Sequence, residues 1–380
     1  MDMVRKPTVW PSNRLTVLTA IVALSGACSH KPPATFAPDP EYIRGMRQIR
    51  ITTGVQRACP GEVIPASYQA QLESGLWVPF SRTYDKKRPP KLHVVFLRRT
   101  SPDAGAQEDG DWSTSPDPTV SAMNGFRLTA FMRENPSVQG FATVEPDYGC
   151  MPHSFSFEGE PGANGEAGFN GPDVTVRLRY LKTPFYPKLL VASIEVGNAP
   201  PLFVFGQPDQ VPPADWLRVE SRGGRGGRGQ TGAKGQVGAN GVAGCPGGAG
   251  GAGGPGGAGG PGGGGGRGGI VTVIVPSDEP LLAGLVEGRS LGGAGGGGGA
   301  GGTGGAGGKG GTIQASPGQQ CQAGANGPEG AKGRAAGDGP DGGPGLRMQV
   351  MTVNRTEVFG IRGGAGLAQL IAYTDGERTR

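Results

Sequence analysis

Five cysteines have the most varied chemistry in this chain of 380 residues, which holds only three histidines. A zinc site needs ligands at close spacing, and no two of Cys59, Cys150, Cys245 and Cys321 provide it. In an exported chain, an even number of separated cysteines instead indicates disulfides, with three pairings open. Their order favours Cys59–Cys150 in the first half and Cys245–Cys321 in the second.

The sequence contains no recognisable catalytic motif. The histidines are His30, His93 and His153, and no nucleophile elbow, phosphate loop, dinucleotide fingerprint or His-Glu-x-x-His is found. The acidic stretch 108–111 does not match the EF-hand spacing, so a solvated acidic turn is preferred over a calcium loop. We therefore expect a protein that is not an enzyme and has no cofactor or metal; an enzyme is the least favoured alternative.

The first 27 residues are typical of an export signal. Arg5, Lys6 and Arg14 give a basic start, and residues 15–24 form an apolar stretch too short to span a membrane. Small residues then lead to Cys28. A cut before Cys28 would leave this lone cysteine at the start of the mature chain.

Cys28, preceded by Gly26 and Ala27, resembles the lipobox of bacterial lipoproteins. The resemblance implies a lipid on Cys28 and membrane contact through this anchor, and Ser29 resembles the outer-membrane sorting pattern. Ser25 departs from the family, which usually has an aliphatic residue there. The alternative is ordinary cleavage at the same place, which gives a secreted protein.

Residues 28–46 are rich in proline and predict a semi-rigid tether that holds the rest of the chain away from a membrane. Residues 47–158 predict a β-sandwich, and residues 159–222 add strands and a short Gly-x-x insert. The clearest alternation is at 173–180, which predicts Val174, Val176, Leu178 and Tyr180 on one face, and Thr175, Arg177 and Arg179 on the face toward water.

An immunoglobulin-like sandwich is one version of this prediction. Tyr148 lies two residues before Cys150, as at a tyrosine corner, and Trp77 lies between the two cysteines of the first half. The separation of Cys59 and Cys150 is longer than usual for such a domain. The alternative is that both aromatic residues simply belong to a core.

Glycine occupies every third position from 223 to 268, and the region 223–345 is organised by this period. From 247 to 270 and from 292 to 312 the pattern becomes Gly-Gly-X. A period of three matches the polyproline II helix, which makes no hydrogen bonds to itself and must bond to neighbours. One glycine per triplet opens one edge to another backbone, and two open two edges.

The Gly-X-Y run resembles bacterial collagen-like proteins, and the Gly-Gly-X runs resemble the polyproline II bundles of certain small antifreeze proteins. The resemblance implies a bundle within one chain. The connector of residues 271–291 partly folds and is therefore too short to return easily along a run, which favours an antiparallel arrangement of the two Gly-Gly-X runs. A collagen-like trimeric stalk and a disordered linker are the alternatives. The run-then-strand unit recurs before residues 174, 270 and 346, so strands should dock beside the runs, with a strand and polar tail at 346–380.

Arg222, Arg225, Arg228 and Lys234 fall in one phase of the period and hence on one side of a run. Arg-Gly-Gly repeats resemble RNA-binding tails, but the export signal argues against a nucleic-acid partner. The row could face anionic envelope polymers such as lipopolysaccharide phosphates; the alternative is that it only keeps the bundle soluble. The formal net charge of +5 does not decide between them.

The sequence as a whole predicts a mainly β, non-enzymatic lipoprotein of the bacterial cell envelope, similar to glycine-rich surface lipoproteins. Its expected role is structural or adhesive, in the outer membrane and facing either the periplasm or the surface. The partners we expect are a membrane, envelope polysaccharide or other surface proteins. The alternative function is a polysaccharide-binding module.

Overall fold

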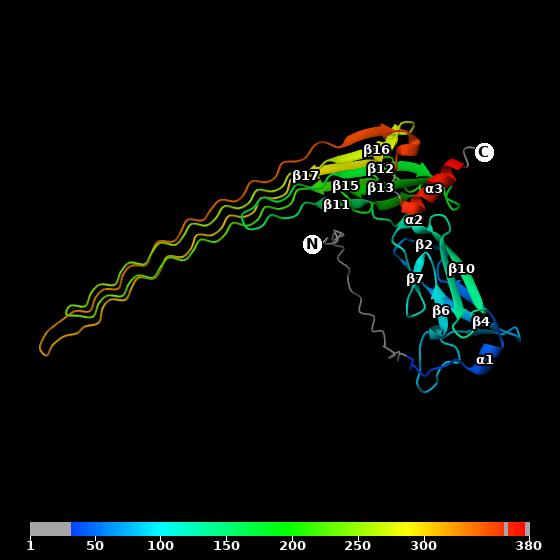
Figure 1. Cartoon of the computed structure of the whole chain (residues 1–380), viewed down its shortest axis with the longest axis horizontal. Coiled ribbons are helices and arrows are strands. Elements are labelled where there is room, and N and C mark those ends of the chain that lie inside the picture. The colour runs from blue at the N-terminus through cyan, green and yellow to red at the C-terminus, as the bar shows by residue number, and fades with distance from the viewer. Residues whose placement is uncertain (1–31, 361–363, 377–380) are drawn as a thin grey trace.

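The computed structural model describes residues 32–360 and 364–376, and the chain is mainly β. Figure 1 shows two groups of sheets side by side, and a long arm of non-helical, non-strand chain that leaves the second group. We call the first group the head, the second the base, and the projecting chain the glycine arm.

The head contains three small sheets around one core. Along strand β9 (Phe126–Met132), every second side chain is buried, which is the period expected when one face of a strand packs inward. Ile64, Tyr68, Trp112 and Phe126 are among the fully buried side chains. The first sheet has the order β1 (Met46–Thr53), β4 (Ala66–Leu72), β5 (Trp77–Pro79). The second has the order β2 (Arg57–Ala58), β10 (Gln139–Pro146), β9, β6 (Leu97–Thr100). The third has the order β3 (Val63–Ile64), β8 (Trp112–Thr114), β7 (Ala104–Ala106). The short helix α1 (Pro40–Arg44) precedes β1, and the short helices η1 (Val94–Phe96) and α2 (Pro118–Ser121) lie between strands.

The base consists of two sheets that face each other across a core, an arrangement consistent with a β-sandwich. One sheet has the order β11 (Ser154–Glu158), β15 (Leu217–Arg222), β17 (Val286–Leu291), all parallel. The other has the order β14 (Leu202–Gly206), β13 (Leu189–Val196), β12 (Val174–Leu181), β16 (Val271–Pro276), β18 (Gln349–Val353). Short helices η2 (Pro280–Leu285) and η3 (Arg355–Glu357) follow β16 and β18. Because β11 pairs with β15, the chain changes from head to base close to the Cys59–Cys150 disulfide rather than after residue 158.

The outer face of the five-stranded sheet is covered rather than wet, which corrects one prediction. Val174, Val176 and Leu178 are buried as expected, but Arg179 on the opposite face is buried as well. Helix α3 (Gly364–Gly376) packs on this face, where the sequence predicted a polar tail. Its Leu367 and Leu370 are fully buried.

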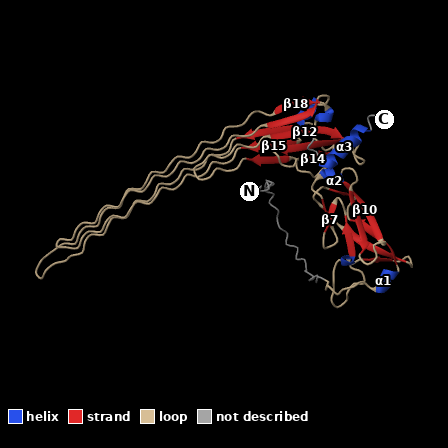
Figure 2. Ribbon diagram, viewed as in Figure 1, coloured by secondary structure: helices blue, strands red, loops and turns tan. Residues whose placement is uncertain are grey.

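Three excursions connect the two sheets of the base (Figure 2). Each leaves a strand of the three-stranded sheet and returns to a strand of the other: β11 to β12, β15 to β16, and β17 to β18. The returning strands β12, β16 and β18 lie next to one another and are parallel, so the predicted run-then-strand repeat is present. Five glycine-rich runs form the excursions: run A (159–171), run B (223–244), run C (247–269), run D (292–312) and run E (324–345).

The runs are hydrogen-bonded to one another at every third residue. Run B donates to run D, as from Gly229 N to Gly297 O at 2.9 Å, and run C donates to run B and to run E. Run D donates backbone hydrogen bonds to run C, as from Gly302 N to Gly257 O at 2.9 Å. Run E donates backbone hydrogen bonds to run D. Runs C and D, the two Gly-Gly-X runs, are antiparallel as expected. Run A lies against runs B and C near the base.

The number of glycines per triplet follows the number of neighbours. Runs C and D each contact three long runs, while B and E each contact two. In run D, a Cβ at Gly301 would lie 1.9 Å from Gly333 O, and one at Gly302 would lie 2.0 Å from Ala233 O. Both rows of glycine in this inner run are therefore required by close backbone approach. In run B the first glycine row makes such an approach from Gly223 to Gly241. The second position is glycine only at Gly224 and Gly227, which approach the backbone of run A, and other residues occupy it farther from the base.

Candidate functional surfaces

The two disulfides have the pairing favoured from the sequence. Cys59 is joined to Cys150 where the head meets the base, with their Cα atoms 6.3 Å apart. Cys245 is joined to Cys321, with Cα atoms 5.2 Å apart, and links the turn between runs B and C to the turn between runs D and E. The second disulfide therefore ties the far end of the glycine arm. Disulfides of this kind persist in oxidising compartments.

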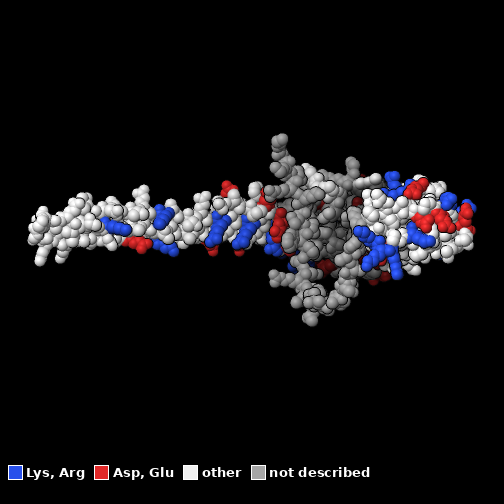
Figure 3. Space-filling view, turned by 90° about the horizontal axis from the view of Figure 1, so that it is seen from below, with Lys and Arg blue, Asp and Glu red and all other residues white. Residues whose placement is uncertain are grey.

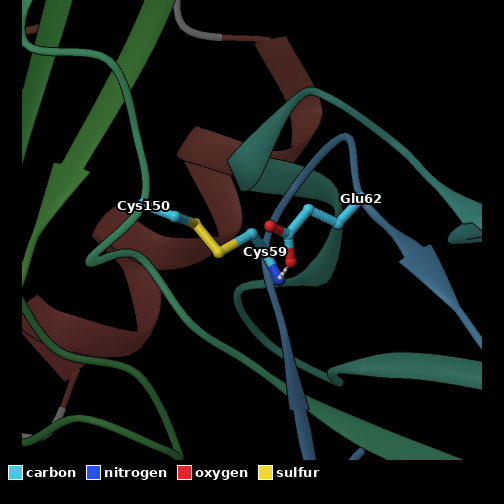
Figure 4. Close-up of side chains that lie close together, drawn as sticks. All are labelled: Cys59, Glu62 and Cys150. Carbon is cyan, nitrogen blue, oxygen red and sulfur yellow. Dashed lines mark hydrogen bonds between the residues drawn. A yellow bond between two sulfur atoms is a disulfide. The ribbon is translucent and has the colours of Figure 1, made fainter. Parts of the chain in front are cut away.

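Cys59, Glu62 and Cys150 lie close together, as in a metal site (Figure 4). Both sulfur atoms are already joined in the disulfide, and metal binding needs free thiolates. The Glu62 carboxylate instead accepts a hydrogen bond from the backbone N–H of Cys59 at 3.3 Å. This group of residues therefore stabilises the junction between head and base and does not provide a zinc ligand set.

His93 and His153 lie in different parts of the chain and form no common site. His93 belongs to the head, and its Nδ1 accepts a hydrogen bond from Val95 N at 3.1 Å. His153 belongs to the base and lies beside Trp216, with ring centroids 5.1 Å apart. Burial lowers the pKa of both imidazoles, which keeps them neutral near pH 7.

The predicted basic row is divided by the structure. Arg222 lies at the end of β15 and is paired with Glu220 at 2.8 Å and with Glu158 at 3.9 Å. The hydrogen bond to Glu220 raises the pKa of the Arg222 guanidinium. Arg225, Arg228 and Lys234 are exposed along run B, and none of the ion pairs of the described chain includes them. Of the predicted row, these three are the cations without an ionic partner among the described residues.

The far end of the glycine arm differs from the part near the base. Residues 235–266 and 310–328 contain no charged residue, and Figure 3 shows Lys, Arg, Asp and Glu side chains concentrated nearer the base. Val242, Val237 and Ile313 are exposed to 79%, 66% and 46%. We call the end formed by residues 241–247 and 311–324 the tip; it is uncharged, partly apolar and rich in glutamine.

The residues before α1 are attached to the head, a feature that the sequence alone did not reveal. Phe36 lies between Tyr84 and Phe96, with ring centroids at 4.9 Å and 4.8 Å. Pro38 is buried. The predicted tether is therefore docked along the head from residue 36 onward, because an aromatic ring within it packs into the head core. An aromatic residue inside the proline-rich segment was the available signal.

A surface pocket of about 610 Å³ opens beside this docked segment. Its walls include Pro32, Val95, Arg98 and Arg133, together with the acidic Glu108 and Asp109. Asp111, next to these acidic residues, is held by Arg82 and accepts a hydrogen bond from Ala66 N at 3.0 Å. The acidic stretch 108–111 is thus partly used in structural contacts.

Cys28 lies outside the described residues. None of the described helices has the length and apolar character required of a membrane-spanning segment. Comparison with known protein families, curated proteins and solved structures gives no match to this chain.

Proposed function

We propose that this protein is a non-enzymatic lipoprotein of the bacterial cell envelope, with a structural or adhesive role carried by the glycine arm. The observation that carries the proposal is the arm itself, in which runs of one chain are hydrogen-bonded at every third residue and tied at the tip by Cys245–Cys321. We infer that the runs are polyproline II helices, since that helix has three residues per turn and leaves its backbone groups free for neighbours. The arm then acts as a spacer of fixed length.

The N-terminal anchor is the first testable part of this proposal. Replacing Cys28→Ser should abolish incorporation of radiolabelled fatty acid and move the protein from the membrane pellet to the soluble fraction, since the thiol is the only site for the lipid. Ser29→Ala is the matched control and should keep the label. A wild-type protein that is itself unlabelled and soluble would support the secreted alternative.

The arm can be shortened without changing its register. Deleting 235–240, 250–255, 303–308 and 325–330 together removes two triplets from each long run at positions that are partners in the bundle. The arm should become about 19 Å shorter at the polyproline II rise, as measured by small-angle scattering. Cells that display this variant should bind less well to surfaces coated with neutral polysaccharide, because the tip reaches less far.

The tip favours the adhesive role and the polysaccharide-binding alternative over a purely structural one. Its glutamines can donate and accept hydrogen bonds to sugar hydroxyls, and Val242 and Ile313 are exposed without apolar cover. Val242→Asp with Ile313→Asp should abolish adhesion to neutral polysaccharide while the arm keeps its length. Unchanged adhesion in both this variant and the shortened one would leave a structural role alone.

A further inference from the structure

The N-terminal segment that is docked on the head from residue 36 onward restricts where the head can lie relative to an anchor on Cys28. Phe36 is fixed between two aromatic rings of the head, and Pro32 lies in the wall of the pocket. Pro32 is only four positions after Cys28 in the sequence. Fully extended, this stretch spans at most about 14 Å. A lipid on Cys28 would therefore bring this side of the head to the membrane surface.

Exposed basic side chains follow Tyr84 in the sequence and line the pocket beside the docked segment. Lys86, Lys87 and Arg88 follow Tyr84, which contacts Phe36 on one side. Arg98 and Arg133 line the pocket on the side of Phe96. We call these five residues the basic face. Figure 3 shows a cluster of Lys and Arg side chains on the head.

The charges of the basic face are available to a ligand. None of the five takes part in the ion pairs of the described chain, whereas the neighbouring Arg82 is paired with Asp111, and Lys91 with Asp39 at 4.0 Å. Arg133 donates through Nε to Leu97 O at 3.3 Å, which fixes the stem of the side chain but does not neutralise the guanidinium. Asp109, which also lines the pocket, accepts a hydrogen bond from Asp111 N at 3.0 Å.

We propose that the basic face docks on the phosphate headgroups of the membrane leaflet that holds the Cys28 anchor. The proposal rests on the lipoprotein function given above. Two observations carry it: the short distance in sequence between Pro32 and Cys28, and five cations of the described head that form no ion pair, of which Arg98 and Arg133 line the pocket together with Pro32. Basic residues near an anionic membrane surface each increase affinity by about fivefold. Together they hold the head flat against the bilayer instead of letting it move freely on a tether.

Limited proteolysis of the lipidated full chain tests this docking. The protein is reconstituted into vesicles of phosphatidylethanolamine with phosphatidylglycerol, or of phosphatidylcholine alone, and trypsin cleavage after Lys86 and Lys87 is followed by mass spectrometry. We expect cleavage to be about tenfold slower on the anionic vesicles at low salt, and to recover in phosphatidylcholine or at high salt. Equal rates on the two vesicle types would overturn the proposal.

Two double charge reversals test which basic residues protect Lys86 and Lys87 from trypsin. Arg98→Glu with Arg133→Glu should remove the protection at Lys86 and Lys87, although neither substitution alters the cleaved bonds. Arg225→Glu with Arg228→Glu is the matched control on the glycine arm, with the same change in charge, and should leave the protection intact. Loss of protection in the control as well would mean that net charge, and not the basic face, is responsible.

Flotation of the same vesicles after a high-salt wash separates the two proposals. A protein that does not float has no lipid anchor, and the proposed function fails with it. A protein that floats but shows no protection is anchored without docking, and only the docking inference fails.

Discussion

Replacing Gly302→Ala should open the glycine arm, whereas Gly337→Ala should leave it intact. A Cβ at Gly302 would lie 2.0 Å from Ala233 O, so run B must move away from run D. A Cβ at Gly337 would meet nothing within 4 Å. Both variants therefore add one methyl group to the same bundle. At Gly302 the methyl group lies between two runs, and at Gly337 it lies on the outer surface.

The expected cost of Gly302→Ala follows from the bonds beside it. Moving the runs apart breaks hydrogen bonds such as Gly232 N to Ala300 O and Gly257 N to Ala233 O, at 2.9 Å and 2.7 Å. These residues are half-buried or exposed, so each hydrogen bond that is lost costs about 0.5–1.5 kcal/mol. Gly337→Ala should instead be neutral or slightly stabilising, since alanine lowers the entropy of the unfolded chain.

Hydrogen exchange of the arm amides, measured by mass spectrometry, is the appropriate readout, because the arm can open while head and base stay folded. Gly257→Ala should give an intermediate result, since its Cβ would lie 3.0 Å from Ala233 N. Solution mass of the same samples separates a bundle within one chain from a trimeric stalk. Equal exchange in the Gly302→Ala and Gly337→Ala variants would contradict the close packing of the inner runs.

Asp375→Ala should destabilise the base by about 3–5 kcal/mol, the cost of leaving a buried charge without its partner. Arg179 is 1% exposed on strand β12, and its guanidinium contacts the carboxylate of Asp375 at the end of α3. The carboxylate is itself 33% exposed, so solvent partly screens the pair and the lower part of the range is expected. Thermal or urea unfolding monitored by circular dichroism provides the measurement.

Two further variants control this experiment. Glu287→Ala removes a partner of the half-exposed Arg218 and should change the stability little, because solvent screens this pair. Arg179→Met with Asp375→Ala replaces the buried pair by apolar groups and should recover most of the lost stability. If Asp375→Ala were as mild as Glu287→Ala, the ion pair would not hold α3 on the sheet.

The strand repeats of the base were predictable because they depend on a local or periodic signal. The cysteine pairing was favoured by the order of the cysteines along the chain. Glycine at every third position directly reports where a side chain is excluded, and the doubled glycines of runs C and D mark the runs with three neighbours. The alternation at 173–180 likewise identified one buried face of β12. The basic row was predicted from its phase in the three-residue period, but Arg222 forms ion pairs and so differs from the other members of the row.

The opposite face of β12 could not be assigned in this way. Arg179 alternates with apolar residues, and alternation alone makes such a residue look exposed. It is buried because α3, nearly two hundred residues later, packs over it and supplies Asp375. The helix itself begins in a glycine-rich stretch, so no capping or periodic signal identified it before its contacts with the sheet were known.

The sequence by itself determined that the chain is mainly β and that its glycine runs associate with period three, because a missing Cβ and an alternating pattern act within a few residues. For the cysteines it favoured pairing within each half but left the other pairings open. Only the tertiary structure decided that Phe36 fixes the N-terminal segment to the head, and that Arg98 and Arg133 line the pocket beside it. These residues come from separate segments and are brought together by sheet pairing and core packing. A surface of this kind has no sequence period, and so it becomes visible only once the fold is known.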